Sequence, residues 1–233
     1  MLRLITFLAF LSWNCTKKTS PSVTDTTTPM SKDSSFTYLA LGDSYTIGES
    51  VKESERFPNQ LADSLKVEGI KISTVKIVAR TGWTTDELQT GITVSGLTET
   101  DTFSMVSLLI GVNNQYRGRS VDDYKPSFTA LLERAIKFAG GKKERVVVVS
   151  IPDYAYTPFG GGRQTISDGI NQFNTANEAI TRSMGVAYAQ ITPISRGGLN
   201  DPTLVASDGL HPSGKQYGRW VSVIKPIAKA FFK

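Results

Sequence analysis

The chain has 233 residues, enough for one well-packed domain, and its 39% hydrophobic and 20% charged residues are ordinary for a soluble globular protein. Its formal net charge is +5, but no run of lysines and arginines alternates with aromatic residues, so nucleic-acid binding is not indicated. One histidine and one cysteine exclude a zinc site built from the usual ligands, and a single cysteine excludes an internal disulfide.

The first 35 residues differ in composition from the rest. An apolar stretch at 4–13 follows the positive charge of Arg3; it is too short to span a bilayer but fits the core of a signal peptide. Cys15 follows it after Asn14, a placement that resembles bacterial lipoprotein signals, in which the cysteine carries the lipid. Residues 16–35 have almost no apolar side chains, which is typical of a flexible tether.

This order predicts an exported bacterial lipoprotein, held at the membrane by a lipid on Cys15, in the periplasm or at the cell surface. A plain export signal with an incidental cysteine remains the alternative. The predicted organisation is a signal peptide at 1–14, the lipid-anchor cysteine and tether at 15–35, and a globular domain at 36–233.

Strand-like and helix-like segments alternate along the domain. Apolar and β-branched runs predict strands at 36–41, 71–79, 104–112, 145–152 and 186–192. Segments with helical spacing predict helices at 57–69, 84–92, 120–141, 167–185 and 213–232. This βα order predicts an α/β fold with a central parallel sheet of about five strands and helices on both faces.

Polar residues follow the predicted strands at the edge where such sheets bind ligands. Ser44 follows the first strand, Gly82 the second and Asn113 the third, while Asp208 and His211 lie beyond the fifth. Each has an ordinary structural interpretation: the serine could cap a helix, the asparagine and aspartate could sit in turns, and the histidine could be structural. Those interpretations do not predict that all of them gather at one edge.

The chemistry of a serine nucleophile needs this set of groups. A hydroxyl becomes nucleophilic when a base takes its proton, and histidine is suited to act as that base. Asp208, three residues before His211, is placed to orient the imidazole. The backbone amides of Ser44 and Gly82 and the side chain of Asn113 could stabilise an oxyanion, and a glycine at 82 lets the backbone approach the substrate. The candidate substrate-pocket residues are Asp43, Trp83, Asn114, Tyr116 and Tyr154.

Four blocks, "LGDSYTIGE", "TGWTT", "GVNN" and "DGLHPS", resemble those of the GDSL-type esterases and lipases, the SGNH hydrolases. The family initials correspond here to Ser44, Gly82, Asn113 and His211, and the resemblance covers residues 36–233 in block order and spacing. It implies a flavodoxin-like three-layer sandwich and ester hydrolysis through a serine acyl-enzyme, with no cofactor and no metal. The third block departs from the usual Gly-x-Asn-Asp, since Asn114 replaces the aspartate, and the first reads GDSY instead of GDSL.

We therefore expect a serine esterase that removes an acyl or acetyl group from a carbohydrate, a lipid or a small ester. An acyltransferase with the same acyl-enzyme remains open, as does a non-catalytic surface-anchored binding protein that keeps the fold. The presence of Ser44, Asp208 and His211 together argues against the binding protein. A phosphate-binding loop and the G-x-S-x-G elbow are absent from the sequence, and a glycosidase using Asp43 and Asp208 would leave the serine and the histidine unexplained.

Overall fold

The computed structural model describes residues 35–232. The predicted signal peptide and Cys15 lie outside the described residues, as does the predicted tether apart from Ser35, with which the first strand begins. Within the described part of the chain, no helix is both long enough and apolar enough to cross a membrane.

Five parallel strands form the central sheet, as predicted, in the order β2-β1-β3-β4-β5. Every residue of β3 and β4 is buried, because helices cover both faces of these central strands and their apolar runs have no polar side. The order is the flavodoxin-like one. The strands are β1 (Ser35–Gly42), β2 (Lys71–Ala79), β3 (Met105–Leu109), β4 (Val146–Val149) and β5 (Ala187–Ala189).

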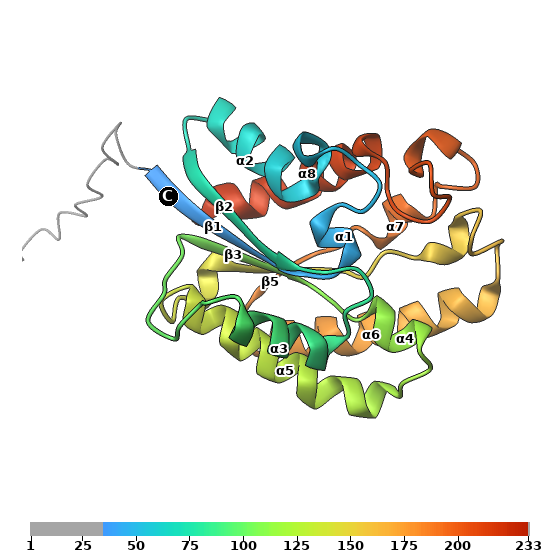
Figure 1. Cartoon of the computed structure of the whole chain (residues 1–233), viewed down its shortest axis with the longest axis horizontal. Helices are drawn as coiled ribbons and strands as arrows, with labels where there is room; N and C mark the ends of the chain where they lie inside the picture. Colours follow the sequence, from blue (N-terminus) through green and yellow to red (C-terminus); the bar gives the residue numbers. More distant parts are fainter. Residues whose placement is uncertain (1–34, 233) are drawn as a thin grey trace, which may run out of the picture. The chain divides into compact units, whose positions relative to one another are not determined.

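Helices cover both faces of the sheet and complete three layers (Figure 1). Helices α2 and α8 pack together on one face, while α3, α5 and α6 lie on the other, with α5 against both of its neighbours. The sequence predicted all five of them. Their bounds are α2 (Phe57–Val67), α3 (Thr85–Val94), α5 (Val121–Phe138), α6 (Gln164–Ser183) and α8 (Gly214–Ala230).

Shorter helical segments, which the sequence pattern did not predict, shape the loops at the sheet edge. They have too few residues to show a hydrophobic period, and their caps and neighbours hold them in place. The short α-helices are α1 (Ser44–Ile47), α4 (Val112–Tyr116) and α7 (Thr192–Ser195). The 3₁₀ turns are η1 (Glu53–Glu55), η2 (Lys143–Arg145), η3 (Tyr154–Tyr156) and η4 (Pro202–Leu204).

The strand order determines where a ligand can bind. From β1 the chain runs to β2 on one side and then crosses to β3 on the other, so a crevice opens between the carboxyl ends of β1 and β3. Gly42 ends β1 at this point, and a Cβ atom there would lie only 2.5 Å from the carbonyl oxygen of Leu109 at the end of β3. A glycine is therefore required for the two strand ends to come this close.

A buried aromatic cluster connects α8 to the start of α1. The ring of Trp220 lies 5.0 Å from that of Tyr217, 6.1 Å from that of Phe57 and 6.4 Å from that of Tyr45. The Tyr45 ring in turn lies 5.2 Å from the ring of His211. Each aromatic pair at such a distance contributes about 0.5–1.5 kcal/mol in addition to the burial of its rings. The core therefore holds Tyr45 and His211 firmly at the edge of the sheet.

Candidate active site

The carboxyl ends of the strands border a cavity of about 250 Å³. Ser44, Gly82, Asn113 and His211, which the sequence places after four different elements, all line it. The remaining lining residues are Tyr45, Thr81, Val112, Tyr116, Tyr154, Phe159 and Leu210, so no charged side chain joins the histidine there. Between residues 35 and 232, no group of three or more His, Cys, Asp and Glu side chains could hold a metal ion.

Ser44 is the first residue of α1, directly beyond the carboxyl end of β1. The N-cap of this helix is Asp43, whose Oδ1 accepts a hydrogen bond from the Tyr45 amide at 3.0 Å. The capping interpretation of the serine is therefore not the one found, because its neighbour caps the helix instead. Ser44 is only 4% exposed, and what remains open faces the cavity.

Asp208 holds His211 by two separate contacts within one turn. Its Oδ1 accepts hydrogen bonds from the amides of Leu210 and His211, both at 2.9 Å, and its Oδ2 lies 2.6 Å from Nδ1 of His211. Ser50 donates a further hydrogen bond to Oδ2 at 2.7 Å. Within the described residues, Asp208 is the sole hydrogen-bond partner of the His211 ring, which leaves Nε2 for the cavity.

These hydrogen bonds keep Asp208 ionised and set the tautomer of the His211 ring. Burial alone would raise the pKa of Asp208, but the hydrogen bonds from the His211 ring, the two backbone amides and Ser50 outweigh it and lower the pKa to about 2. An ionised carboxylate can only accept, so Nδ1 of His211 carries the proton and, in the neutral ring, Nε2 is the basic nitrogen. This is the orientation that a general base acting on the cavity requires.

Gly82 and Asn113 line the cavity from the loop after β2 and from helix α4. Gly82 has a φ of +85°, a conformation that favours glycine. Nδ2 of Asn113 donates a hydrogen bond to the carbonyl oxygen of Trp83 at 2.9 Å, which orients the amide group. The amides of Ser44 and Gly82 donate to no acceptor among the described residues. The three groups therefore combine two free amides with one oriented side-chain amide.

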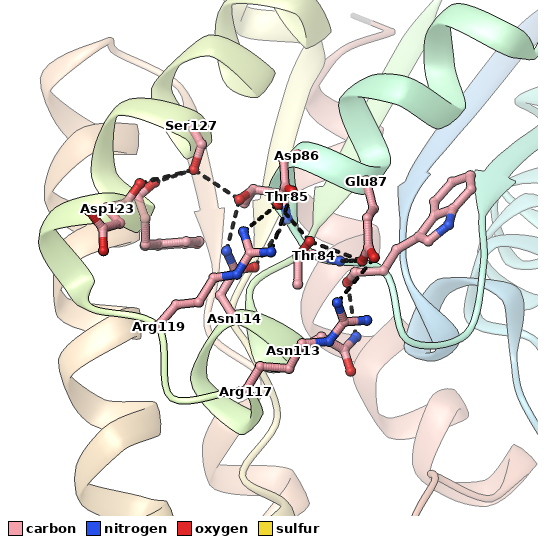
Figure 2. A network of polar contacts seen from close by, with 12 residues as sticks. Thr84, Thr85, Asp86, Glu87, Asn113, Asn114, Arg117, Arg119, Asp123 and Ser127 are labelled. Carbon is pink, nitrogen blue, oxygen red and sulfur yellow. Dashed lines mark hydrogen bonds and ion pairs between the residues drawn. The ribbon is translucent and has the colours of Figure 1, made fainter.

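Asn114 does not line the cavity, and its side chain lies against Thr85 instead (Figure 2). It is 1% exposed; its Oδ1 accepts from the Thr85 amide at 3.1 Å and its Nδ2 donates to Thr85 Oγ1 at 2.9 Å. The hydroxyl of Thr85 also lies 2.9 Å from that of Ser127 on α5. Asn114 thus joins α4 to the start of α3, and its amide satisfies one donor and one acceptor at once.

Two more of the candidate pocket residues do not line the cavity. Asp43 is fully buried, and burial raises its pKa to about 7 against the lowering effect of the hydrogen bond from Tyr45. The ring of Trp83 covers Gly91 of α3, where a Cβ atom would overlap it. Of the five residues that the sequence proposed for the pocket, Tyr116 and Tyr154 line it, whereas Asp43, Trp83 and Asn114 pack elsewhere.

The loop after β4 contributes an aromatic residue that the sequence reasoning did not select. Phe159 lies 6.2 Å from Tyr116 and 6.3 Å from Tyr154, measured between ring centroids, and those two tyrosine rings are 6.2 Å apart. Phe159 is 46% exposed and Tyr116 59%, so the cluster forms one open wall of the cavity. The loop "PDYAYTPFGGGR" could be identified from its place after a strand, but not the direction of each side chain.

Comparisons with known proteins show the family of the chain and its fold. A family model described as the GDSL-like Lipase/Acylhydrolase family matches residues 40–219. None of the curated proteins is a significant match to the chain.

The similar solved structures have the same fold at low sequence identity. A lipase/acylhydrolase from Enterococcus faecalis is 19% identical with a TM-score of 0.65, covering 84% of this chain and 96% of its own. The lipase Lip_vut3 from a goat rumen metagenome is 15% identical with a TM-score of 0.68, covering 83% and 98%. Axe2, an acetylxylan esterase from Geobacillus stearothermophilus, is 15% identical with a TM-score of 0.59, covering 84% and 93%.

Proposed function

Because the chain belongs to the GDSL-like lipase/acylhydrolase family, we propose that it hydrolyses carboxylic esters with Ser44 as the nucleophile. One observation carries this proposal: Ser44 and His211 line the same cavity, and the carboxylate of Asp208 lies 2.6 Å from the ring nitrogen of His211. A serine, an imidazole and a carboxylate in this order form the unit that activates a hydroxyl.

The reaction runs in two halves. Nε2 of His211 takes the proton of the Ser44 hydroxyl as Oγ attacks the ester carbonyl, and the imidazolium is stabilised by the ionised Asp208. The same nitrogen then gives this proton to the departing alcohol oxygen, which leaves an acyl group on Ser44. A water molecule, deprotonated in turn by His211, attacks the acyl carbonyl; the imidazolium then returns this proton to Oγ of Ser44 as its bond to the acyl carbon breaks, and the carboxylic acid is released.

The negative charge of each tetrahedral intermediate falls on the former carbonyl oxygen. The amides of Ser44 and Gly82 and the side chain of Asn113 are the donors available to it. Because Asn113 is already bound to Trp83 by one of its two N–H groups, the other can be aimed without reorganisation during the reaction.

The cavity wall favours an uncharged, apolar acyl group. Its side chains beyond the proposed catalytic ones are mainly aromatic and aliphatic, and none could pair with a charge on the substrate. Tyr116 and Phe159 are half exposed in the free protein, so an acyl chain that covers them gains apolar burial.

Hydrolysis of p-nitrophenyl acetate and butyrate by the purified protein tests the proposal. We expect Ser44→Ala to remove the activity, together with labelling by a fluorophosphonate, and to leave the circular dichroism spectrum unchanged, since the variant loses one hydroxyl and no cap. Full hydrolysis by the Ser44→Ala variant would refute the assignment.

The site is also proposed to act at a membrane, through a lipid on Cys15 of the exported protein. We expect the native protein to enter the detergent phase of a Triton X-114 partition and the Cys15→Ser variant to stay in the aqueous phase. Identical partitioning of both would favour the plain export signal.

A further inference from the structure

Gly82, a proposed oxyanion donor, lies in a loop with little packing around it. A Cβ atom built on this glycine would have one neighbour within 4 Å, Nη2 of Arg117 at 3.7 Å. Glycine is also the residue with the widest choice of backbone conformations. The direction of the Gly82 peptide groups therefore depends on contacts that reach the loop from outside.

Two side chains of the α4 segment supply such contacts. Nη2 of Arg117 donates a hydrogen bond to the carbonyl oxygen of Gly82 at 2.6 Å, and Nδ2 of Asn113 donates to that of Trp83 at 2.9 Å. Asn113 and Arg117 are four residues apart, so they lie on the same face of this helical turn. Together they bind two successive carbonyl groups of the loop that follows β2.

The guanidinium of Arg117 is itself held in place. Its Nη1 lies 3.0 Å from Oε1 of Glu87, whose Oε2 accepts hydrogen bonds from the amide of Thr84 at 2.8 Å and from its hydroxyl at 3.0 Å (Figure 2). Arg117 therefore connects the capped N-terminus of α3 to Gly82. A planar guanidinium suits this position because its fork reaches two acceptors at once.

The exposure of the ion pair indicates that its role is geometric. The side chains of Arg117 and Glu87 are 42% and 38% exposed, and ion pairs with this access to water add little to stability. Arg117 does not line the cavity, so it can act on the site only through the loop that it binds.

We infer that Arg117 is a positioning residue: it holds the carbonyl group of Gly82 and so limits the movement of the Gly82 amide, on the other side of the same Cα, that the proposed oxyanion hole uses; this inference rests on the proposed ester hydrolysis. Displacing a donor by a fraction of an ångström weakens its bond to the developing oxyanion while leaving the binding of the neutral ester almost unchanged. The loss should therefore appear in kcat and not in KM.

The test compares Arg117→Met with Arg119→Met. Arg119 is a matched control, because it extends from the same segment and pairs with Asp86 at 2.5 Å but has no hydrogen bond to the loop carbonyls (Figure 2). With p-nitrophenyl butyrate we expect Arg117→Met to lower kcat about tenfold at constant KM and constant Tm, less than the ~10²–10³-fold lost when a donor is removed outright. The inhibition constant of a trifluoromethyl ketone should rise by the same factor, because this inhibitor forms an oxyanion on Ser44.

Arg119→Met should stay within about twofold of wild type in both measurements. Arg117→Lys should be intermediate, because a single ammonium group cannot reach both acceptors in the geometry of the planar guanidinium. An unchanged kcat in Arg117→Met, or an equal loss in Arg119→Met, would overturn the inference. A measurement independent of catalysis is the ¹⁵N relaxation of the Gly82 amide, which should become mobile in Arg117→Met alone. Absence of any Ser44-dependent hydrolysis would refute the proposed function, while the Gly82 amide would still report on the positioning.

Discussion

The adjacent asparagines of α4 are expected to fail in different ways when each is changed to alanine. Asn113 lines the cavity and is half-buried, whereas Asn114 is buried and bound twice to Thr85. On the proposed mechanism, Asn113→Ala removes a group that acts on the transition state. Asn114→Ala removes contacts that hold α4 against the start of α3.

The structure sets the size of each effect. Loss of one preorganised oxyanion donor lowers kcat about 10²–10³-fold, roughly 2.7–4 kcal/mol, with little change in KM. Asn114→Ala breaks two buried hydrogen bonds and leaves the amide of Thr85 without its acceptor, which together should lower the free energy of unfolding by about 2–3 kcal/mol. For a domain of this size that loss corresponds to a fall in Tm of roughly 5–10 °C.

Steady-state kinetics with p-nitrophenyl butyrate and thermal unfolding of both variants measure the two effects separately. Two isosteric changes act as controls. Asn113→Asp keeps the size but removes the donor, so its kcat should fall as in Asn113→Ala. Asn114→Asp should remain near wild type, because the hydroxyl of Thr85 can rotate to donate to the new carboxylate. A large loss of kcat in Asn114→Ala with near-normal Asn113→Ala would show that the oxyanion donor is the other asparagine.

Three further changes test other parts of the site. Asp208→Asn should lower kcat by about 10⁴-fold, because an NH₂ group in place of Oδ2 no longer fixes the tautomer of His211. The Tm should be nearly unchanged, since Oδ1 still accepts the hydrogen bonds of the two turn amides. The raised pKa of Asp43, about 7, means that the folded state holds this proton more tightly than the unfolded chain, so stability is highest below the unfolded pKa of 3.8 and falls as pH rises through 7. Between pH 5 and 8 the free energy of unfolding of the wild type should fall by about 3 kcal/mol from this cause. Denaturant unfolding of Asp43→Asn should show a much smaller fall over the same pH range. An equal fall in the variant would exclude Asp43 as the cause of the pH dependence. Phe159→Ala should lower kcat/KM for p-nitrophenyl hexanoate about fivefold and that for the acetate less, because a half-exposed ring offers about 1 kcal/mol of further burial to a longer chain; equal losses on both esters would contradict an acyl-binding wall.

Much of the fold follows from local patterns in the sequence. The continuous apolar runs of β3 and β4 could only belong to strands buried on both faces, and helix α5 begins after a capping serine, Ser120, and ends before Gly140. Because all strands are parallel, their carboxyl ends share one edge, and this alone places Ser44 and Asn113 on the same side of the sheet. The strand order is not encoded in any one segment; the resemblance to the GDSL-type family implied the flavodoxin-like order, and the structure confirms it.

The direction of single side chains in the strand-end loops could not be predicted. Trp83 follows a strand and is therefore expected in the pocket. Its ring instead covers Gly91 of helix α3, eight residues further along the chain. Arg117 and Ser50 carried no signal, because their roles depend on reaching Gly82 and Asp208 from other loops. Ser50 has a φ of 62°, unusual for a residue other than glycine, and only coordinates reveal it.

The three-residue spacing between Asp208 and His211 has a physical reason in this turn. A carboxylate has two oxygens, and here they accept from different donors, since Oδ1 binds the amides that close the turn and Oδ2 binds the ring that the turn carries. The turn and the orientation of the imidazole therefore form or fail together. Gly209, with a φ of 71°, lets the chain reverse between them. The same geometry that stabilises the loop therefore also fixes which ring nitrogen of His211 is left for the cavity that Ser44 lines.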